Sequence, residues 1–292
     1  MTSLRDQVAV VTGGGRGLGR AFAQVLAGAG ASVAVLARTT DELAETVALI
    51  EASGGRARAF RTDVTAGETV RGVFAEIESA LGPVDLLVNN AGSIGSFGPF
   101  WETDLDEWWR VVDINLRGQL VCAHCVLPGM IARRRGRIIN ISTGMRPIAN
   151  LSGYMTSKTA LVRFTECVAA EARPYGVSLF SLAPGTVRTR MSEYSLHSEE
   201  GKKWLPWYRR IFDEGLDLPA ERAAQWVLDL ASGKADRLSG RYFTPMDDMD
   251  VLLQGAAEIE KQELHTLRIR GLSHNLNPAL ASVYAASEKV QE

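Results

Sequence analysis

Short apolar runs rich in β-branched residues alternate with longer amphipathic stretches through most of the chain. The stretches repeat apolar residues at helical spacing and close on glycine, as in "TDELAETVALIEASG". Runs that are apolar throughout are typical of strands buried on both faces, and such strands form parallel sheets with helices on each side. The alternation therefore predicts a single-domain, doubly wound α/β fold of the Rossmann type, with about seven strands. The expected strands cover residues 8–12, 32–37, 58–62, 84–89, 137–142, 177–183 and 241–245.

The first run leads directly into a glycine-rich turn, "TGGGRGLGRAF", which opens an amphipathic stretch. Gly13, Gly17 and Gly19 carry no side chain, so a pyrophosphate can approach the backbone, and the amides of a helix N-terminus add positive charge. A glycine triad alone is weak evidence, but this one has the strand–turn–helix context that the mechanism needs. We expect this turn to bind a dinucleotide through Gly13, Gly15, Arg16, Gly17, Leu18 and Gly19.

A second candidate site lies in "NISTGMRPIANLSGYMTSK", where Tyr154 precedes Lys158 by four residues. Residues four apart share one face of a helix, so the ammonium can lie beside the phenol. A nearby cation would lower a phenol pKa that starts near ~10 and make the group a usable general acid or base. The same spacing occurs by chance on many helices, so the pair needs support from other motifs.

Taken together, the motifs resemble those of the short-chain dehydrogenase/reductase family of single-domain Rossmann oxidoreductases. The spacing T-G-x-x-x-G-x-G resembles the family's cofactor loop, and Tyr154-x-x-x-Lys158 resembles its catalytic pair. Four further motifs follow the family's order: "DV" at 63–64, an adenine-contacting pair; "NNAG" at 89–92, which follows the fourth strand; the helix-kink Asn115; and "PGTVRT" at 184–189, the nicotinamide-side loop. The resemblance covers roughly residues 5 to 246.

The resemblance implies an oxidoreductase that moves a hydride between a nicotinamide and a carbonyl or secondary alcohol, with Tyr154 as the general acid or base. It also implies that Lys158 touches the cofactor ribose, that Asn115 holds a water linking this lysine to solvent, and that the protein is a homodimer or homotetramer. The implied cofactor contacts beyond the glycine turn are Asp63, Val64, Asn90, Ala91, Gly92, Tyr154, Lys158, Pro184, Gly185, Val187 and Thr189.

The end of the second expected strand favours NADP over NAD as the cofactor. NAD-preferring Rossmann sites place an acidic residue there to bind the ribose 2′-hydroxyl, but this chain has Ala37 followed by Arg38. Arg16 in the glycine turn adds a second guanidinium near the same place, and two guanidiniums can bind a 2′-phosphate that no carboxylate repels. The alternative is that both arginines are solvated surface residues.

The third catalytic hydroxyl is either Ser142 or Thr143. The family's hydroxyl typically lies 13 residues before the tyrosine, whereas these two lie 12 and 11 residues before Tyr154. Anchoring on the strand, which cannot slip by one residue without turning its core residues outward, favours Thr143. Residue type and the smaller loop deletion favour Ser142, which we prefer on balance.

Two segments depart from the alternation. The segment 188–218 has no expected strand but contains Trp204, Trp207 and Tyr208, so we interpret it as an insertion that covers the substrate. Residues 247–270 are expected to form a charged amphipathic helix that begins a C-terminal extension, 247–292, after a catalytic domain at 1–246.

Composition narrows the class of protein. A net charge of -2 gives no hint of a nucleic-acid partner, and no window approaches the roughly 20 apolar residues of a membrane span. Three cysteines cannot form a disulfide framework, and the C-x-x-C around His124 lies in an apolar helical pattern with no second ligand pair. We expect no metal site and a cytoplasmic location. The expected substrate is a small-molecule carbonyl compound or alcohol with a bulky or apolar body.

Two other classes of protein share parts of this pattern. A non-catalytic dinucleotide sensor would keep the glycine turn but would not need the set of Tyr154, Lys158 and Asn115. A methyltransferase on a Rossmann-like sheet would also use a glycine turn without the tyrosine–lysine pair. An assay of carbonyl substrates with NADPH separates the enzyme from the sensor.

Overall fold

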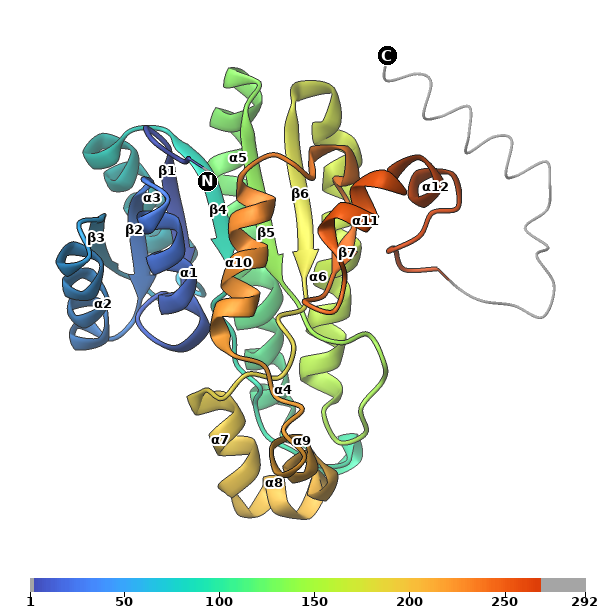
Figure 1. Ribbon diagram of the computed structural model, residues 1–292. Coiled ribbons are helices and arrows are strands. Elements are labelled where there is room, and N and C mark those ends of the chain that lie inside the picture. Colours follow the sequence, from blue (N-terminus) through green and yellow to red (C-terminus); the bar gives the residue numbers. More distant parts are fainter. Residues whose placement is uncertain (1–2, 269–292) are drawn as a thin grey trace.

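The computed structural model describes residues 3–268 and contains one parallel sheet of seven strands in the order β3-β2-β1-β4-β5-β6-β7 (Figure 1). This is the Rossmann-like arrangement that the sequence predicts, so the expected fold class is confirmed. The strands are β1 (Val8–Thr12), β2 (Ser32–Ala37), β3 (Arg56–Arg61), β4 (Val84–Asn89), β5 (Gly136–Ile141), β6 (Val177–Leu182) and β7 (Tyr242–Phe243).

Several strand ends differ from the expected positions. β3 is an edge strand whose arginines are exposed, so its alternation does not mark its ends clearly. β7 has only two residues because the chain turns at Gly240, with a φ of 86°, and again at Thr244, whose carbonyl accepts from the Asp247 amide.

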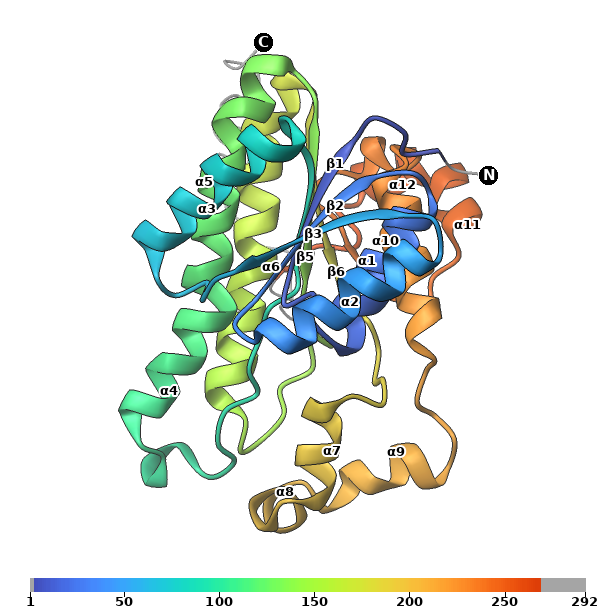
Figure 2. The same ribbon diagram turned by 90° about the vertical axis from the view of Figure 1, so that its left-hand side faces the viewer.

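Helices cover both faces of the sheet, and the strands divide their side chains between two cores. On β1, Ala9 and Val11 join one core while Val8 and Val10 join the other, as the period of two requires. Figure 2 shows the two helical layers on opposite sides of the strands. The layers are α1 (Gly17–Gly28), α2 (Thr40–Ala52) and α10 (Ala220–Ala231) on one face, and α3 (Gly67–Leu81), α5 (Gly118–Arg133) and α6 (Ser152–Ala172) on the other.

The topology brings the candidate motifs to one edge of the sheet. The chain leaves β3 at one edge and returns to the centre as β4, next to β1, so the strand order reverses between these two strands. Ligands bind at such a switch point, outside the carboxyl ends of the strands. The glycine turn follows β1, "NNAG" overlaps the end of β4, Ser142 follows β5, and "PGTVRT" follows β6 shortly after its end.

The segment 188–218 is a helical excursion from this edge. It is framed by a parallel β-bridge between Val187 and Leu218, and the Leu218 amide donates to the Thr186 carbonyl at 2.7 Å. Figures 1 and 2 show its helices as a group beyond the carboxyl ends of the strands. They are α7 (Arg190–His197), α8 (Glu199–Trp204), the 3-10 turn η4 (Pro206–Tyr208) and α9 (Arg209–Asp213).

The prediction of a single helix over residues 247–270 is wrong. The chain forms two short helices, α11 (Met249–Gln254) and α12 (Ala256–Lys261), which meet at Gly255. Leu252, Ala256 and Ile259 are buried in the same core as α1 and α10. This part of the extension is therefore packed on the catalytic domain, while residues 269–292 lie outside the described residues. The remaining helical elements are η1 (Phe100–Glu102), α4 (Leu105–Val112), η2 (Asp113–Arg117), η3 (Arg173–Tyr175) and η5 (Asp236–Leu238).

Candidate active site

Tyr154 and Lys158 lie in the first turns of α6, at the carboxyl edge of the sheet. Lys158 is only 3% exposed, and its Nζ donates to the Ile141 carbonyl at the end of β5 at 2.7 Å. Tyr154 is half-buried and packs against the apolar residues beneath α8 and η4. The two residues thus lie one helical turn apart on α6, and the lysine is also tied to the sheet.

The pKa values of the pair move in directions set by burial. Burial raises the pKa of Tyr154, and a hydrogen bond with the Thr143 hydroxyl opposes this rise. Burial lowers the pKa of Lys158 to about 8. The net lowering of the phenol pKa that the lysine spacing suggests is therefore wrong for this structure, because removal from water dominates. Near neutral pH the phenol carries its proton.

The two adjacent hydroxyls have different surroundings. Ser142 is 2% exposed, and its Oγ donates to the Lys158 carbonyl at 3.3 Å, so it faces the body of α6. Thr143 is half-buried and its side chain lies by the Tyr154 phenol, where it opposes the rise of the phenol pKa, while its carbonyl accepts from the Tyr242 hydroxyl at 3.0 Å. The position of the side chains therefore favours Thr143, against the preference for Ser142 drawn from loop length. The register of β5 decides which hydroxyl faces the phenol.

Asn115 lies in η2, a single π-helical turn that joins α4 to α5. Such turns are rare and occur frequently at functional sites. The Asn115 side chain is fully buried, donates to the Ser93 carbonyl at 2.8 Å and to Ser157 Oγ at 3.1 Å, and accepts from the Ser93 amide. A Cβ on Gly92 would lie 3.3 Å from Asn115 Oδ1 and 3.6 Å from Lys158 Nζ, so these two polar groups both reach Gly92.

The glycine turn and the "NNAG" motif hold each other in place. Thr12 Oγ1 accepts from the amides of Asn90 and Ala91 at 2.9 and 3.0 Å, and Asn90 Nδ2 donates to the Thr12 carbonyl at 2.9 Å. A Cβ on Gly19 would lie 2.2 Å from the Gly13 carbonyl oxygen, which leaves no room for a side chain. This close packing shapes an open backbone turn before α1 and fits the approach of a pyrophosphate.

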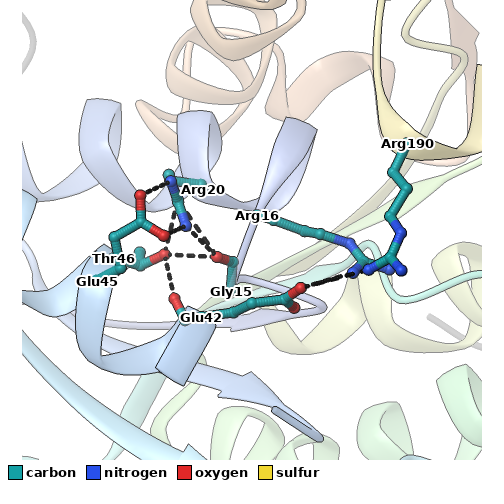
Figure 3. Close-up of polar contacts among 7 residues, drawn as sticks. All are labelled: Gly15, Arg16, Arg20, Glu42, Glu45, Thr46 and Arg190. Atoms are coloured by element: carbon teal, nitrogen blue, oxygen red, sulfur yellow. Dashed lines mark hydrogen bonds and ion pairs between the residues drawn. The ribbon is translucent and has the colours of Figure 1, made fainter. Parts of the chain in front are cut away.

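The carbonyl of Gly15 is fixed by residues that the sequence analysis missed. Arg20 Nη2 donates to it at 2.7 Å and Thr46 Oγ1 at 2.9 Å, and Arg20 also binds both carboxylate oxygens of Glu45 (Figure 3). These side chains come from α1 and α2, so the two helices clamp the glycine turn. Their polar spacing on the helices carries no signal that would mark them in the sequence.

The adenosine end of the site, beyond β2, contains both predicted arginines, and each faces a carboxylate. Arg16 Nη1 lies 2.6 Å from Glu42 Oε1, and Arg38 Nη1 lies 3.7 Å from Asp63 Oδ2. The expectation that no carboxylate lies near Arg16 is therefore wrong: Glu42, in the first turn of α2, was missed. Burial opposes ionisation of Asp63, but hydrogen bonds from Thr65 and the charge of Arg38 outweigh it and lower its pKa.

Val64 and Leu18 support the site from the core. Val64 is buried, and a Cβ on Gly118 would lie 2.8 Å from its Cγ2. The segment that follows β3 therefore packs directly against the start of α5. Leu18 is half-buried against the core that contains α1 and α10.

The nicotinamide-side loop lies against the glycine turn. Thr189 Oγ1 accepts from the Ser192 amide and caps α7, and a Cβ on Gly17 would lie 3.6 Å from Thr189 Cγ2. Gly185 has a φ of 77°, where a side chain would be strained and would meet Leu218 at 2.6 Å. Pro184 and Val187 are buried at the start and middle of the loop.

An apolar cluster joins Tyr154 to the segment 188–218. Of the aromatic residues expected there, Trp204 and Tyr208 pack against the cluster, whereas Trp207 is 44% exposed. Burial raises the pKa of Tyr208 to about 12, the phenol of Tyr154 adds to this, and a hydrogen bond with Thr186 opposes it. The buried members of the cluster are Phe97, Leu151, Met155 and Leu205.

Within residues 3–268, no three His, Cys, Asp or Glu side chains gather as a metal site would require. Burial raises the pKa of Cys122 to about 12, which suits an inert helix residue. Among the described helices, none is long and apolar enough to cross a membrane.

Comparisons with known proteins show which family the chain belongs to. The family model described as short chain dehydrogenase matches residues 7–200. A short-chain dehydrogenase of Pseudocercospora fijiensis is 33% identical over 282 residues, covering 91% of this chain and 90% of that protein.

Two solved structures have the same fold. An NAD⁺-bound xylitol dehydrogenase superposes with a TM-score of 0.75 at 26% identity, over 82% of this chain and 97% of that one. A metagenomic short-chain oxidoreductase in complex with NADP superposes with a TM-score of 0.66 at 31% identity, over 78% and 91%. Such relatives bind either nicotinamide cofactor. The chain belongs to the short-chain dehydrogenase/reductase family and is an NAD(P)-dependent oxidoreductase acting on CH–OH groups.

Proposed function

We propose that the protein is an NADP-preferring carbonyl reductase or alcohol dehydrogenase for a bulky, apolar substrate, with Tyr154 as its general acid or base. The observation that carries this proposal is the placement of the Tyr154 phenol, which lies beside Thr143, one helical turn before the buried Lys158, and contacts the apolar cluster. A sensor has no need of this arrangement.

A bound nicotinamide supplies or accepts the hydride, and the residues of the chain handle the proton. In reduction, the Tyr154 hydroxyl donates its proton to the substrate oxygen. Burial raises the pKa of this phenol, which supports a protonated donor near neutral pH. Thr143 holds the substrate oxygen beside the phenol through its hydroxyl.

Lys158 and Asn115 provide the route by which a proton returns to the phenol after Tyr154 has donated its own. The ammonium of Lys158 stabilises the phenolate and contacts the cofactor ribose, and its pKa of about 8 allows it to exchange protons under ordinary conditions. Asn115 and Lys158 both reach Gly92, which supports a water between them that links the lysine to solvent. The same residues return the proton to Tyr154.

The preference for NADP rests on the arginines of the adenosine end. Ala37 stands where NAD-preferring sites carry a carboxylate. Arg38 is well exposed, and the carboxylate that it faces, that of Asp63, lies 3.7 Å from its guanidinium. Arg16 approaches from the glycine turn. A 2′-phosphate can bind between two guanidiniums and gain charge-assisted hydrogen bonds from both.

The substrate proposal rests on the apolar cluster and the segment 188–218. Met155, Trp204 and Tyr208 border the Tyr154 side chain with apolar surface and offer one hydroxyl, that of Tyr208. We expect a ketone or secondary alcohol with a large hydrocarbon part, over which the segment 188–218 closes.

A substrate screen with purified protein tests the function. Bulky ketones and secondary alcohols are offered with NADPH or NADP⁺ and, in parallel, with NADH or NAD⁺, and turnover is followed by nicotinamide absorbance. We expect turnover of apolar ketones with NADPH. Tight binding of NADPH without turnover of any carbonyl or alcohol substrate would favour the sensor instead.

We further expect a homodimer or homotetramer in the cytoplasm. Free cysteines at 122, 125 and 167 support a reducing compartment. Light scattering of the purified protein measures the assembly, and a monomer at micromolar concentration would contradict this expectation.

A further inference from the structure

A third arginine reaches the adenosine end from an unexpected direction. Arg190 is the first residue of α7, in the segment 188–218, yet its Nη1 lies 3.8 Å from Glu42 Oε1. Arg16 Nη1 approaches the same oxygen at 2.6 Å. Figure 3 shows the guanidinium groups of Arg16 and Arg190 gathered on one side of this carboxylate.

The backbone explains how a residue of the substrate segment comes so close to the nucleotide loop. Arg190 follows Thr189, which caps α7 and lies against Gly17 of the glycine turn. Glu42 is held in the first turn of α2, where a Cβ on Gly15 would lie 3.1 Å from the Glu42 Cβ. The first turn of α7 and the first turn of α2 therefore face each other across the end of the glycine turn.

The charges at this end leave the arginines with capacity for a further anion. One carboxylate, Glu42, serves both Arg16 and Arg190, while the nearby Glu45 is already bound by Arg20 through both oxygens. The contact of Arg190 at 3.8 Å is too long for a hydrogen bond, and its side chain is 75% exposed. Such an exposed pair is weak and can yield to a stronger partner such as a dianionic phosphate.

We propose that Arg190 is a phosphate-binding residue for the cofactor, which joins Arg16 and Arg38 around the 2′-phosphate of NADP. This inference rests on the proposed preference for NADP. Glu42 holds the guanidinium of Arg190 near the position where the phosphate binds, and the phosphate then takes over the contact. Because Arg190 begins α7, cofactor binding at this end also fixes the start of the segment that covers the substrate.

Fragments of the cofactor test the proposal without turnover. Adenosine 2′,5′-bisphosphate carries the 2′-phosphate, and adenosine 5′-monophosphate lacks it. Binding of each to the full chain is measured by calorimetry for the wild type, Arg190→Gln and the control Arg210→Gln. Arg210, on α9, is an exposed arginine of the same segment and pairs with Glu214.

We expect Arg190→Gln to weaken the bisphosphate by about tenfold or more, the worth of one hydrogen bond to a charged group, and to leave the monophosphate unchanged. Arg210→Gln should change neither. Equal binding of the bisphosphate by wild type and Arg190→Gln would overturn the role of Arg190, even if the wild type prefers the bisphosphate. Equal binding of both fragments by the wild type would instead overturn the NADP preference and this inference with it.

Glu42→Gln separates direct binding from a structural role. If Arg190 mattered only as a salt-bridge partner that anchors α7, loss of the Glu42 charge would weaken the bisphosphate as much as Arg190→Gln does. A direct contact predicts that Glu42→Gln leaves bisphosphate binding equal or tighter, because a repelling carboxylate is removed. A loss of affinity that matches Arg190→Gln would refute the proposal.

Discussion

The catalytic centre and the adenosine end lie on the same edge of the sheet but are built differently. At the centre, Lys158 and Asn115 are almost completely buried and held by hydrogen bonds to backbone carbonyls. At the adenosine end, the side chains of Arg16, Arg38 and Arg190 are between 47% and 75% exposed and meet carboxylates at 2.6 to 3.8 Å.

Under the proposed roles, the difference separates the residues of the chemistry from those of cofactor selectivity. Buried hydrogen bonds fix proton-transfer geometry within narrow limits, and changing one leaves an unpaired polar group in a region without water. Exposed guanidiniums contribute less each, are screened by salt and can exchange partners. Substitutions at the centre should therefore affect rate strongly, and substitutions at the adenosine end should affect cofactor choice more mildly.

The largest effect should come from Tyr154→Phe, which removes the proton donor and little else. We expect kcat to fall by about 10²–10⁴, the usual worth of a general acid, with the Kd for NADPH within a few-fold of wild type. Single-turnover absorbance and fluorescence titration measure the two quantities. Residual activity within about tenfold of wild type would exceed what loss of this group permits.

Next in size is the contrast between Thr143→Ala and Ser142→Ala, which probes the centre at two adjacent positions. We expect Thr143→Ala to lower kcat by a factor of about 10², as loss of one preorganised donor does. Thr143→Ser, which keeps the hydroxyl, should retain most of the wild-type kcat. Ser142→Ala removes only the side-chain bond to the Lys158 carbonyl, so it should lower Tm while leaving kcat close to that of wild type. If Ser142→Ala had the larger effect on kcat, Ser142 would be the catalytic hydroxyl.

Arg38→Asp tests the adenosine end. A carboxylate at this position would repel the 2′-phosphate and offer a partner to a ribose hydroxyl, so we expect NADPH to weaken by at least about tenfold and NADH by much less. Arg71→Asp on α3, another exposed arginine that pairs with a carboxylate, is the matched control. Wild-type protein that binds NADH as tightly as NADPH would contradict the prediction.

The smallest effect concerns stability against pH. Burial lowers the pKa of Lys158 from 10.5 to about 8, so between these values the folded protein has released a proton that the unfolded chain keeps. Because the unfolded state binds more protons in this window, this lysine should raise stability as pH rises from about 8 toward 10.5, and below pH 8 its charged form counts against folding.

Thermal unfolding between pH 7.5 and 10 measures this effect, with Lys158→Met as the comparison. We expect the difference in Tm between variant and wild type to shrink as pH rises, since the neutral lysine resembles the methionine. A difference that stays constant with pH would show that Lys158 does not change charge in this window.

Local sequence patterns predict most of the strands and helices of this protein, because these patterns depend only on residues that are neighbours in the chain. Continuous apolar runs identify the central strands, and β1, β2 and β4 begin and end where the sequence places them. The helical repeat places Tyr154 beside Lys158. The edge strand β3 and the two-residue β7 are less well placed, because an exposed arginine-rich strand and a strand between two turns carry little apolar pattern.

By itself, the sequence determined the fold class, the order of the motifs and the tyrosine–lysine pair, because period, glycine spacing and chain order are local properties. Tertiary structure favoured Thr143 between the two hydroxyls that the sequence left open, and it alone decided that burial rather than the lysine sets the direction of the Tyr154 pKa. It also decided that Glu42 joins Arg16 to Arg190. These outcomes depend on which distant segments meet and on how much water remains between them, and neither is written in the spacing of residues along the chain.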